Sequence, residues 1–391
     1  MRVFFFFSLL FSLQMYGQQW NYPIAPKSKS VDTFFNVVVP DEYKVLEDFK
    51  NSNTQDWLNR EQQVTVSYFR KTAIDYFLDA ELASVNYKSN IAKRSGKLFF
   101  KYLYVDENES PSVFYSNKLV SHSESTEELI YNDVYNADFE LLLSPDKFKG
   151  SDKVNFGAVF TSGNDSLVAF FYAKKGSDWK EIGIIEPKSK RILPDHIEGV
   201  KSTNLQWDEN GFYYCRYDSI NNINIHLDRP AYEKIFYHKL GTLQQDDQVV
   251  FWRNLLPDEL LSFHISADGN FLIVNDYNSQ SEELSIYYKD LKKGTSFFPL
   301  VRNTKDKVSI IGNNDTLFYA FTNVHGASNN LVVEININNP NKWEKVIGES
   351  EKYYLSNAVY YDDQFLLLYQ GDERQYLRLY NLQTNTSKTL Q

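Results

Sequence analysis

The residue types that carry most enzyme chemistry do not form a catalytic pattern in this sequence. The nearest approach to a nucleophile elbow, Gly-x-Ser-x-Gly, is Gly326-Ala327-Ser328-Asn329-Asn330, which lacks the closing glycine. In such an elbow the serine occupies a strained turn, and the next backbone N–H enters the oxyanion hole. We therefore predict that this stretch is a turn between two strands and not a catalytic nucleophile.

The histidines and carboxylates also lack catalytic or metal-ligand spacing. No histidine has a second histidine or a carboxylate at the spacing that a metal site on one helix requires. The six histidines are His122, His196, His226, His238, His264 and His325. The acidic pairs Asp246-Asp247 and Asp362-Asp363 lie where solvated turns are expected. Because a glycine-rich phosphate loop is also missing, we predict no catalytic residues, no metal site and no cofactor.

Short strands are the elements available to position any site. From Thr203 to Arg253, four aromatic and β-branched runs alternate with turn-forming residues, which is typical of one blade of a β-propeller. Similar units recur with a period of about 45 residues. They run from Lys97 to about Tyr135, Val154 to Leu193, Thr203 to Arg253, Leu261 to Arg302, Val308 to Ile347 and Tyr353 to Leu390. The single cysteine, Cys215, is expected to be a strand residue without a disulfide partner. We predict an all-β fold, a β-propeller with about six four-stranded blades.

The region before the propeller contains an export signal and a helix. Residues 1–18 have a positive start, a short apolar run and a small residue before Gln18, as in a signal peptide. Residues 19–95 contain an amphipathic helix from Ser52 to about Leu82, with Ser52 and Gln55 expected to form a capping box. Residues 96–391 form the propeller. We predict a protein exported to the periplasm or the cell exterior, with no membrane anchor.

The charge balance bears on the class of partner. The net charge is −10, and no basic stripe is visible along the sequence. Nucleic acid is therefore not predicted as a partner. Basic or neutral peptides remain compatible with this balance.

Several short motifs, in their order along the chain, resemble the N-terminal part of the prolyl oligopeptidase family of serine peptidases. The motifs are Tyr22-Pro23, Asp32, Pro40 to Asp48, Trp57 with Gln62, Gly176 to Trp179, Trp207 to Tyr217, Tyr237 to Thr242 and Ser266 to Gly269. Glu42, Lys44 and Val45 depart from the usual family form of the opening motif. His238 lies in the family's strand motif Tyr-His-x-Leu-Gly-Thr, where the resemblance implies a structural role.

The resemblance implies a seven-bladed propeller that covers an α/β-hydrolase domain. In this family the Ser, Asp and His of the triad all follow the propeller, whereas this chain ends after the expected sixth blade. Aligned on Trp207, the family's substrate-facing propeller positions fall on Asn204 and Ile185, for which an ordinary strand role is equally compatible. Asn204 replaces a cysteine, and Ile185 keeps the apolar character of a methionine.

Two functions follow from these expectations. In the first, the chain is the substrate-gating propeller of a secreted endopeptidase that cleaves short peptides after proline. It would lack the triad, be inactive alone, and need a seventh blade and hydrolase domain in trans. The alternative is a stand-alone propeller of the cell envelope that binds peptides or another protein. An apolar helix that packs on a hydrolase domain in the family, and strand edges left by a six-bladed ring, favour the first function.

Overall fold

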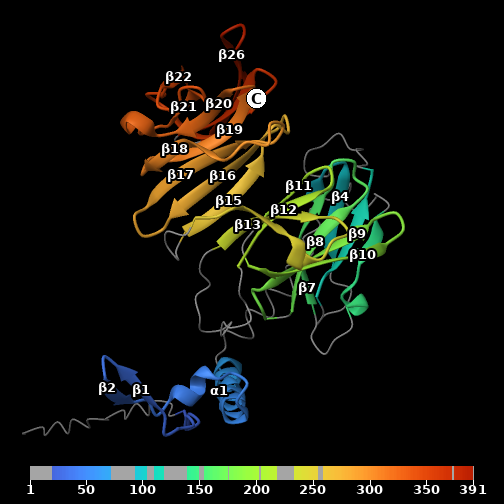
Figure 1. Ribbon diagram of the computed structural model, residues 1–391, viewed down its shortest axis with the longest axis vertical. Coiled ribbons are helices and arrows are strands. Elements are labelled where there is room, and N and C mark those ends of the chain that lie inside the picture. The colour runs from blue at the N-terminus through green and yellow to red at the C-terminus, as the bar shows by residue number, and fades with distance from the viewer. Residues whose placement is uncertain are drawn as a thin grey trace, which may run out of the picture. The chain divides into compact units, whose positions relative to one another are not determined.

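The computed structural model describes most of the chain from Trp20 to Leu390 (Figure 1). The described residues are 20–71, 93–103, 110–118, 139–148, 154–174, 176–201, 204–217, 233–253, 259–371 and 374–390. They fall into two units, residues 20–71 and residues 93–390. The predicted signal peptide, residues 1–18, lies outside the described residues.

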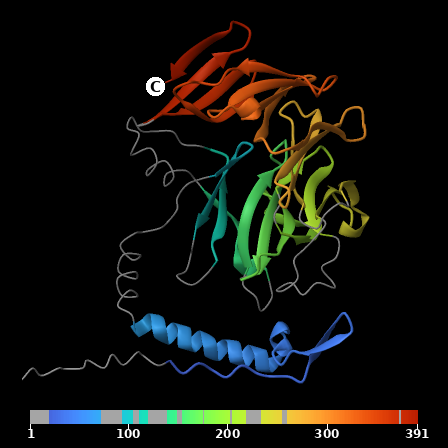
Figure 2. The ribbon, with the colours of Figure 1, turned by 90° about the vertical axis from the view of Figure 1, so that its left-hand side faces the viewer.

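The first unit consists of a hairpin, a short 3-10 helix and one long α-helix. Its elements are β1 (Val31–Phe34), β2 (Val37–Pro40), η1 (Lys44–Glu47) and α1 (Ser52–Lys71). An extended segment runs along α1 (Figure 2), where the Trp57 indole N–H donates to the Pro23 carbonyl at 3.2 Å. Among the described residues, no helix is long and apolar enough to cross a membrane.

The start of α1 differs from the predicted capping box. The side-chain oxygen of Asn51 accepts a hydrogen bond from the Asn53 N–H at 3.0 Å, so Asn51 is the N-cap and Ser52 is the first helical residue. The Gln55 side chain donates to the Phe49 carbonyl instead of reaching the N-cap. Asparagine and serine are about equally good caps, so residue preference alone does not choose between these neighbours. The predicted continuation of the helix from residue 72 to Leu82 lies outside the described residues.

The second unit contains six four-stranded antiparallel sheets, each formed by four consecutive strands. Blade 1 contains β3 (Lys93–Ser95), β4 (Leu98–Leu103), β5 (Ser112–Ser116) and β6 (Glu140–Leu143). Blade 2 contains β7 (Val154–Thr161), β8 (Val168–Lys174), β9 (Lys180–Glu186) and β10 (Arg191–Val200). Blade 3 contains β11 (Leu205–Trp207), β12 (Gly211–Tyr217), β13 (Glu233–Lys239) and β14 (Gln248–Phe251).

The remaining three sheets follow the same pattern. Blade 4 contains β15 (Glu259–Ile265), β16 (Phe271–Asn278), β17 (Glu283–Asp290) and β18 (Phe298–Thr304). Blade 5 contains β19 (Val308–Asn314), β20 (Leu317–Thr322), β21 (Leu331–Asn336) and β22 (Trp343–Ile347). Blade 6 contains β23 (Tyr354–Tyr361), β24 (Gln364–Gln370), β25 (Gln375–Asn381) and β26 (Thr386–Leu390). Short 3-10 helices η2 (Pro145–Lys147), η3 (Gln244–Asp246) and η4 (Val324–Gly326) lie in the connections. The prediction of an all-β fold with six four-stranded blades is confirmed.

Blade 1 differs in its limits from the predicted unit. Its first strand begins at Lys93, before the expected start of the propeller at residue 96. Its fourth strand is Glu140–Leu143, beyond the expected end of the unit near Tyr135. The predicted end of the unit, residues 128–135, lies outside the described residues. The sequence pattern does not distinguish residues 128–135 from Glu140–Leu143 as the fourth strand, because both runs are short and similarly apolar.

The second strand of each inner blade is buried on both faces, which explains its continuous apolar sequence. In β20, Phe318 and Ala320 belong to a cluster shared with blade 4, whereas Tyr319 and Phe321 belong to a cluster shared with blade 6. The strands β8, β12 and β16 alternate in the same way between their two neighbours. Five such clusters join the described residues of blades 1 and 2, 2 and 3, 3 and 4, 4 and 5, and 5 and 6.

Hydrogen bonds also join the first strands of neighbouring blades. The Trp207 indole N–H on β11 donates to the Phe160 carbonyl on β7 at 2.9 Å. The Asn204 side-chain amide donates to the Phe263 carbonyl on β15 at 2.8 Å. Ser95 and Thr161, on β3 and β7, are joined through their hydroxyls at 3.0 Å. These bonds align the first strands, so that the turns following them lie together.

We predict that Trp207→Phe lowers the free energy of unfolding by about 1 kcal/mol, because the Phe160 carbonyl loses its donor while most ring packing is kept. The measurement is urea denaturation followed by circular dichroism. Trp252→Phe is the matched control, since this indole is largely exposed. An equal loss in both variants would show that ring size, and not the hydrogen bond, determines the effect.

A buried polar network joins blades 2 and 3 around His238 on β13. The His238 Nδ1 lies 2.7 Å from Asp247 Oδ1, and its Nε2 lies 3.2 Å from Asp195 Oδ1 on β10. The Tyr214 hydroxyl donates to Asp247 Oδ2 at 2.6 Å, and the Gly241 N–H donates to Asp195. The side chains of His238 and Asp247 have no exposed surface. The prediction that Asp247 lies in a solvated turn is therefore wrong, because its carboxylate is needed to pair this buried histidine.

Candidate functional site

Blades 2 to 6 carry carboxylates at the turn between their first and second strands. We call these side chains the acidic turns: Asp165, Asp208, Glu209, Asp268, Asp315, Asp362 and Asp363. Asp165, Asp315, Asp362 and Asp363 adopt positive φ, a conformation that aspartate tolerates better than most side chains. Turn chemistry therefore selects this residue type in each repeat, and the propeller fold then gathers the turns at one end of the sheets.

Hydrogen bonds link the acidic turns from blade to blade. The Lys97 backbone N–H of blade 1 donates to Asp165 at 3.1 Å. The Asn313 amide of blade 5 donates to Asp268 of blade 4 at 2.9 Å, and Asn314 donates to Asp363 of blade 6 at 3.2 Å. Part of the carboxylate set is thus structural, because it fixes the relative position of neighbouring turns.

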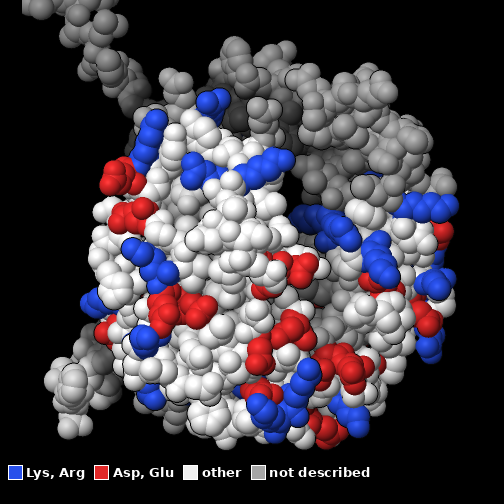
Figure 3. Space-filling view, turned by 90° about the horizontal axis from the view of Figure 1, so that it is seen from above, with Lys and Arg blue, Asp and Glu red and all other residues white. Residues whose placement is uncertain are grey.

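Among the described residues, the acidic turns lack cationic side-chain partners. In the described part of the chain, none of the seven forms an ion pair with a lysine, an arginine or a histidine. Hydrogen bonds from Tyr360, Gln383 and Asn314 lower the pKa of Asp363, so this half-buried carboxyl is ionised at neutral pH. In the view from above, Asp and Glu side chains lie on one side of a hollow, and Lys and Arg side chains border it as well (Figure 3). Several unpaired carboxylates at one end of the sheets attract cations and repel anions.

A hollow of about 830 Å³ lies among the turns of blades 2, 3 and 4. Its lining is Ser162, Gly163, Asn164, Trp207, Asp208, Glu209, Ile265, Asp268, Gly269, Asn270, Leu291 and Lys292. Trp207, Ile265 and Leu291 supply apolar wall, and the charged lining is three carboxylates of the acidic turns with one cation, Lys292. A volume of this size is within the range of sites for small ligands or short peptide segments.

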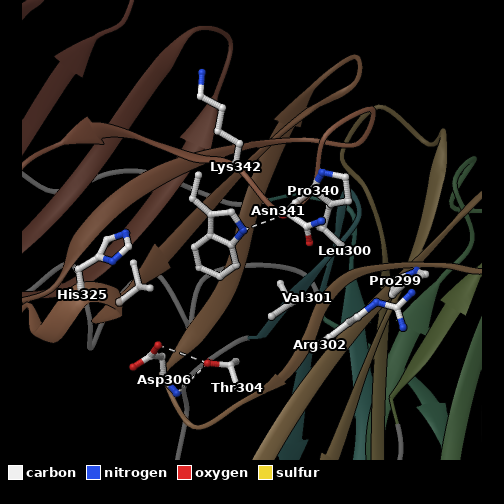
Figure 4. Close-up of a pocket in the computed structure, with 12 residues that line it drawn as sticks. Pro299, Leu300, Val301, Arg302, Thr304, Asp306, His325, Pro340, Asn341 and Lys342 are labelled. Carbon is white, nitrogen blue, oxygen red and sulfur yellow. Dashed lines mark hydrogen bonds between the residues drawn. The ribbon is translucent and has the colours of Figure 1, made fainter.

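A second hollow, of about 650 Å³, lies between the outer strand of blade 4 and the connections of blade 5 (Figure 4). Its lining is Pro299, Leu300, Val301, Arg302, Thr304, Asp306, Val324, His325, Pro340, Asn341, Lys342 and Trp343. The Trp343 indole is held by a hydrogen bond to the Pro340 carbonyl, and Lys342 pairs with Glu344 at 2.6 Å and points away from the hollow. Charges of both signs surround it, so its lining does not select one class of ligand.

The two residues inferred to face substrate lie at different blade interfaces. Ile185 on β9 has no exposed surface and belongs to the hydrophobic cluster between blades 1 and 2. Asn204 precedes β11 and joins blades 3 and 4 through Phe263. The structure therefore does not bring them together. A substrate contact at either residue stays a prediction, and at Ile185 it would require the core to open.

The stretch from Gly326 to Asn330 is a turn between β20 and β21, as predicted. Ser328 is exposed, and among the described residues no hydrogen bond joins it to a histidine. Asn330 is buried and donates to the Leu355 carbonyl at 2.8 Å, which links blades 5 and 6. Cys215 is buried in the cluster between blades 3 and 4. The contacts of this turn and of Cys215 are therefore those of residues that stabilise the fold.

The sequence missed the grouping of the acidic turns. Each turn was recognised by its own residues, but a single turn does not indicate that its neighbours lie beside it. The available signal was the recurrence of aspartate after the first strand of successive repeats, from Asp165 to Asp363.

Comparison with known proteins identifies the family. Residues 22–391 match the family model described as prolyl oligopeptidase, N-terminal beta-propeller domain. The chain belongs to this family. The match includes both units and all six blades, so the predicted family resemblance is confirmed.

Similar proteins are considerably longer than this propeller chain. It is 26% identical over 339 residues to a prolyl endopeptidase of Elizabethkingia meningoseptica, covering 85% of this chain and 45% of the relative. It is 25% identical over 412 residues to prolyl oligopeptidase A of Amanita bisporigera, covering 94% of this chain and 52% of the relative. The chain thus spans about half the length of these curated relatives.

Solved structures support the same fold. A structure from a mechanistic study of two prolyl endopeptidases matches with a TM-score of 0.71 and 24% identity, covering 95% of this chain and 53% of the other. Oligopeptidase B from Leishmania major matches with a TM-score of 0.67 and 15% identity, covering 95% of this chain and 53% of the other. At these identities the likeness shows the propeller fold alone.

Proposed function

We propose that this chain is the substrate-gating propeller of an exported prolyl-oligopeptidase-type serine endopeptidase that cleaves short peptides after proline. The chain contains no nucleophile elbow, so the serine, aspartate and histidine would come from an α/β-hydrolase domain outside this sequence. The prolyl endopeptidases that it resembles are about twice its length. The propeller is inactive by itself in this proposal.

The observation that carries the proposal is an uncovered apolar face on blade 6. Phe365, Leu367 and Tyr369 of β24 pack toward blade 5, so Leu366 and Leu368 face the opposite way. The register places Leu379 and Leu377 of β25 directly beside these two leucines. Val359 on β23, opposite Leu366, is 50% exposed. In the inner blades the equivalent faces are buried between sheets, so this face fits a further blade of the complete enzyme.

The first unit offers a second uncovered apolar surface. Both strands of the β1–β2 hairpin are exposed, and the large apolar side chains with high exposure are Val31, Phe34, Phe35, Val37, Val38 and Val39. Monomeric proteins rarely expose apolar surface of this extent. A hydrolase domain packed on this unit would cover it, and would supply the catalytic groups.

The acidic turns and the hollow among them support a role in admitting peptides. In our proposal, short substrates reach the catalytic domain through the propeller, while folded proteins are excluded by size. Unpaired carboxylates such as Asp208 and Glu209 would raise the local concentration of basic peptides and slow the entry of acidic ones. The apolar wall at Trp207 would contact the peptide without selecting a particular side chain of the substrate.

The proposal is tested by co-expressing this chain with the reading frame that follows its last codon, and assaying hydrolysis of a short chromogenic proline peptide. We expect no hydrolysis by the chain alone and hydrolysis by the combination. A soluble, monomeric chain that gains no activity, or a downstream frame without an elbow serine, would contradict the proposal. The chain would then be a binding propeller.

We predict that Leu366→Lys combined with Leu379→Lys lowers the recovered activity at least about tenfold, because two charges would be buried in the contact with the next blade. The measurement is the initial rate of proline-peptide hydrolysis at equal concentrations of both parts. Ser387→Lys on the exposed outer strand β26 is the matched control and should keep the activity. An unchanged rate in the double variant would show that blade 6 is not the contact.

A further inference from the structure

Three side chains with metal-ligating atoms meet on the outer strands of blade 2. Glu181 lies on β9, and His196 and Glu198 lie on β10. One ligand atom from each residue lies within 4.8 Å of the other two. Helical metal-ligand spacing does not indicate this group, because its three residues lie on strands. On a strand, residues two apart share a face, and the third ligand comes from the neighbouring strand.

The sheet register determines why these three side chains share a face. His196 pairs with Gly183, and Ile197 pairs with Ile182. Ile182 and Ile197 are buried in the cluster with blade 3, so the side chains that alternate with them point to the opposite face. Gly183 has no side chain there, and the Phe170 ring packs closely over its backbone.

Contacts from neighbouring elements hold the His196 ring and the backbone of Glu198. The Tyr172 ring on β8 stacks on the His196 ring with centroids 6.4 Å apart and an interplanar angle of 19°. The Gln244 side chain accepts a hydrogen bond from the Glu198 N–H at 3.0 Å and donates to the Glu198 carbonyl at 2.9 Å. A preorganised donor set costs less to order when a metal ion binds. The side chains of Glu181 and His196 are 27% and 44% exposed, so the group is open to solvent.

We infer that Glu181, His196 and Glu198 form a binding site for a zinc ion, with water at the remaining position. One imidazole nitrogen and two carboxylates are ligands that zinc accepts, and three protein ligands with an open position are common at zinc sites that exchange water. Two carboxylates also balance the charge of a divalent cation. Imidazole makes the set more favourable for zinc than for magnesium or calcium, which prefer oxygen ligands.

Zinc binding requires only small side-chain movements. The His196 Nε2 and the Glu181 Oε2 are 2.7 Å apart, as in a hydrogen bond. Ligand atoms around a tetrahedral zinc ion are separated by about 3.4 Å. The metal would therefore replace the proton shared by this pair, part the two atoms slightly and draw Glu198 inward. The alternative is that His196 and Glu181 form an ion pair that joins β9 to β10 and binds no metal.

The experiment is a titration of the complete, tag-free chain with zinc chloride, after treatment with a chelator and dialysis. Isothermal titration calorimetry should show one zinc ion bound per chain, and the melting temperature should rise with zinc concentration. Magnesium chloride at the same concentrations should change neither. Glu198→Gln should lower zinc affinity about tenfold or more, because the amide is a weaker ligand.

Glu198→Gln keeps the Glu181–His196 hydrogen bond, so its folding without zinc should match that of the unchanged chain. His196→Ala should abolish binding, and His325→Asn, which changes an exposed histidine far along the sequence, should bind zinc as before. The inference is overturned if the unchanged chain shows no saturable zinc binding. It is also overturned if Glu198→Gln and His196→Ala bind zinc as tightly as His325→Asn does.

Discussion

Replacing His238 by alanine is expected to lower the free energy of unfolding by about 3 to 5 kcal/mol, because two buried carboxylates lose their shared partner. Asp195 comes from blade 2 and Asp247 from blade 3, and both contact the imidazole of His238. Without it, Asp247 keeps only the Tyr214 hydroxyl and Asp195 only the Gly241 N–H among the donors described above. The measurement is equilibrium unfolding in urea at neutral pH.

Tyr214→Phe separates loss of the network from loss of one hydrogen bond. This variant removes only the hydroxyl that donates to Asp247 at 2.6 Å, so its cost is expected to be about 1 to 2 kcal/mol. A His238→Ala variant as mild as Tyr214→Phe would mean that the two carboxylates find other partners. The account of a charged inter-blade network would then be wrong.

The same network makes stability depend on pH. Burial disfavours the charged imidazolium of His238, but hydrogen bonds and charge attraction from Asp247 and Asp195 outweigh it and raise the pKa of His238. A histidine with a raised pKa in the folded state contributes stability that is full below the unfolded-state pKa of about 6.5. That contribution is lost as pH rises through the folded-state pKa. The difference in unfolding free energy between the unchanged chain and His238→Ala should therefore shrink toward alkaline pH.

Glu233→Gln is expected to stabilise the propeller by about 2 to 3 kcal/mol at pH 8 and to have little effect at pH 4. Glu233 begins β13 and is buried, and its Oε1 has no hydrogen-bond partner in the described part of the chain. Burial raises the pKa of Glu233 to about 7, and this outweighs the opposing hydrogen bond from the Leu261 backbone. Glutamine keeps the size of the side chain without the charge.

The sign of this effect follows from proton binding. Between the unfolded-state pKa, about 4.3, and the folded-state value, the unfolded chain has lost the proton while the folded chain keeps it. Stability therefore falls as pH rises through this window and stays low above it. Unfolding free energies at a series of pH values, for the unchanged chain and for Glu233→Gln, test the prediction. The exposed residue Glu351 supplies the control Glu351→Gln, which should not change the curve. A Glu233→Gln variant less stable at pH 8 would show that the carboxylate has a partner there.

The number of blades and most strands could be predicted because each blade is encoded by a local repeat. The second strands, such as Gln364–Gln370, read as continuous apolar runs because both of their faces are buried in a propeller. The family likeness also follows from sequence order alone, since its motifs extend through nearly the whole chain. In blade 1 the repeat is interrupted by long connections, and its fourth strand was therefore placed too early.

The surroundings of side chains that contact residues far away in the sequence could not be predicted. Asp247 has the sequence surroundings of a solvated turn, yet its carboxylate is enclosed by His238 and Tyr214. The family resemblance implied a substrate contact at Ile185, which stays a prediction, and only the fold shows that this side chain lies in the core between two blades. The burial of a side chain depends on which blade packs against it, and local residue patterns carry no information about that neighbour.

By itself, the sequence determined the propeller fold, its repeat and its family, because short-range strand and turn preferences recur in every blade. Only the tertiary structure decided which carboxylates are buried, which lie together at the acidic turns, and which meet His196 on blade 2. It also decided that Val359 and Leu366, on one face of blade 6, stay partly exposed. The physical reason is the same in each case: the energy of a charge or an apolar side chain depends on its surroundings, and residues far apart in the sequence provide them.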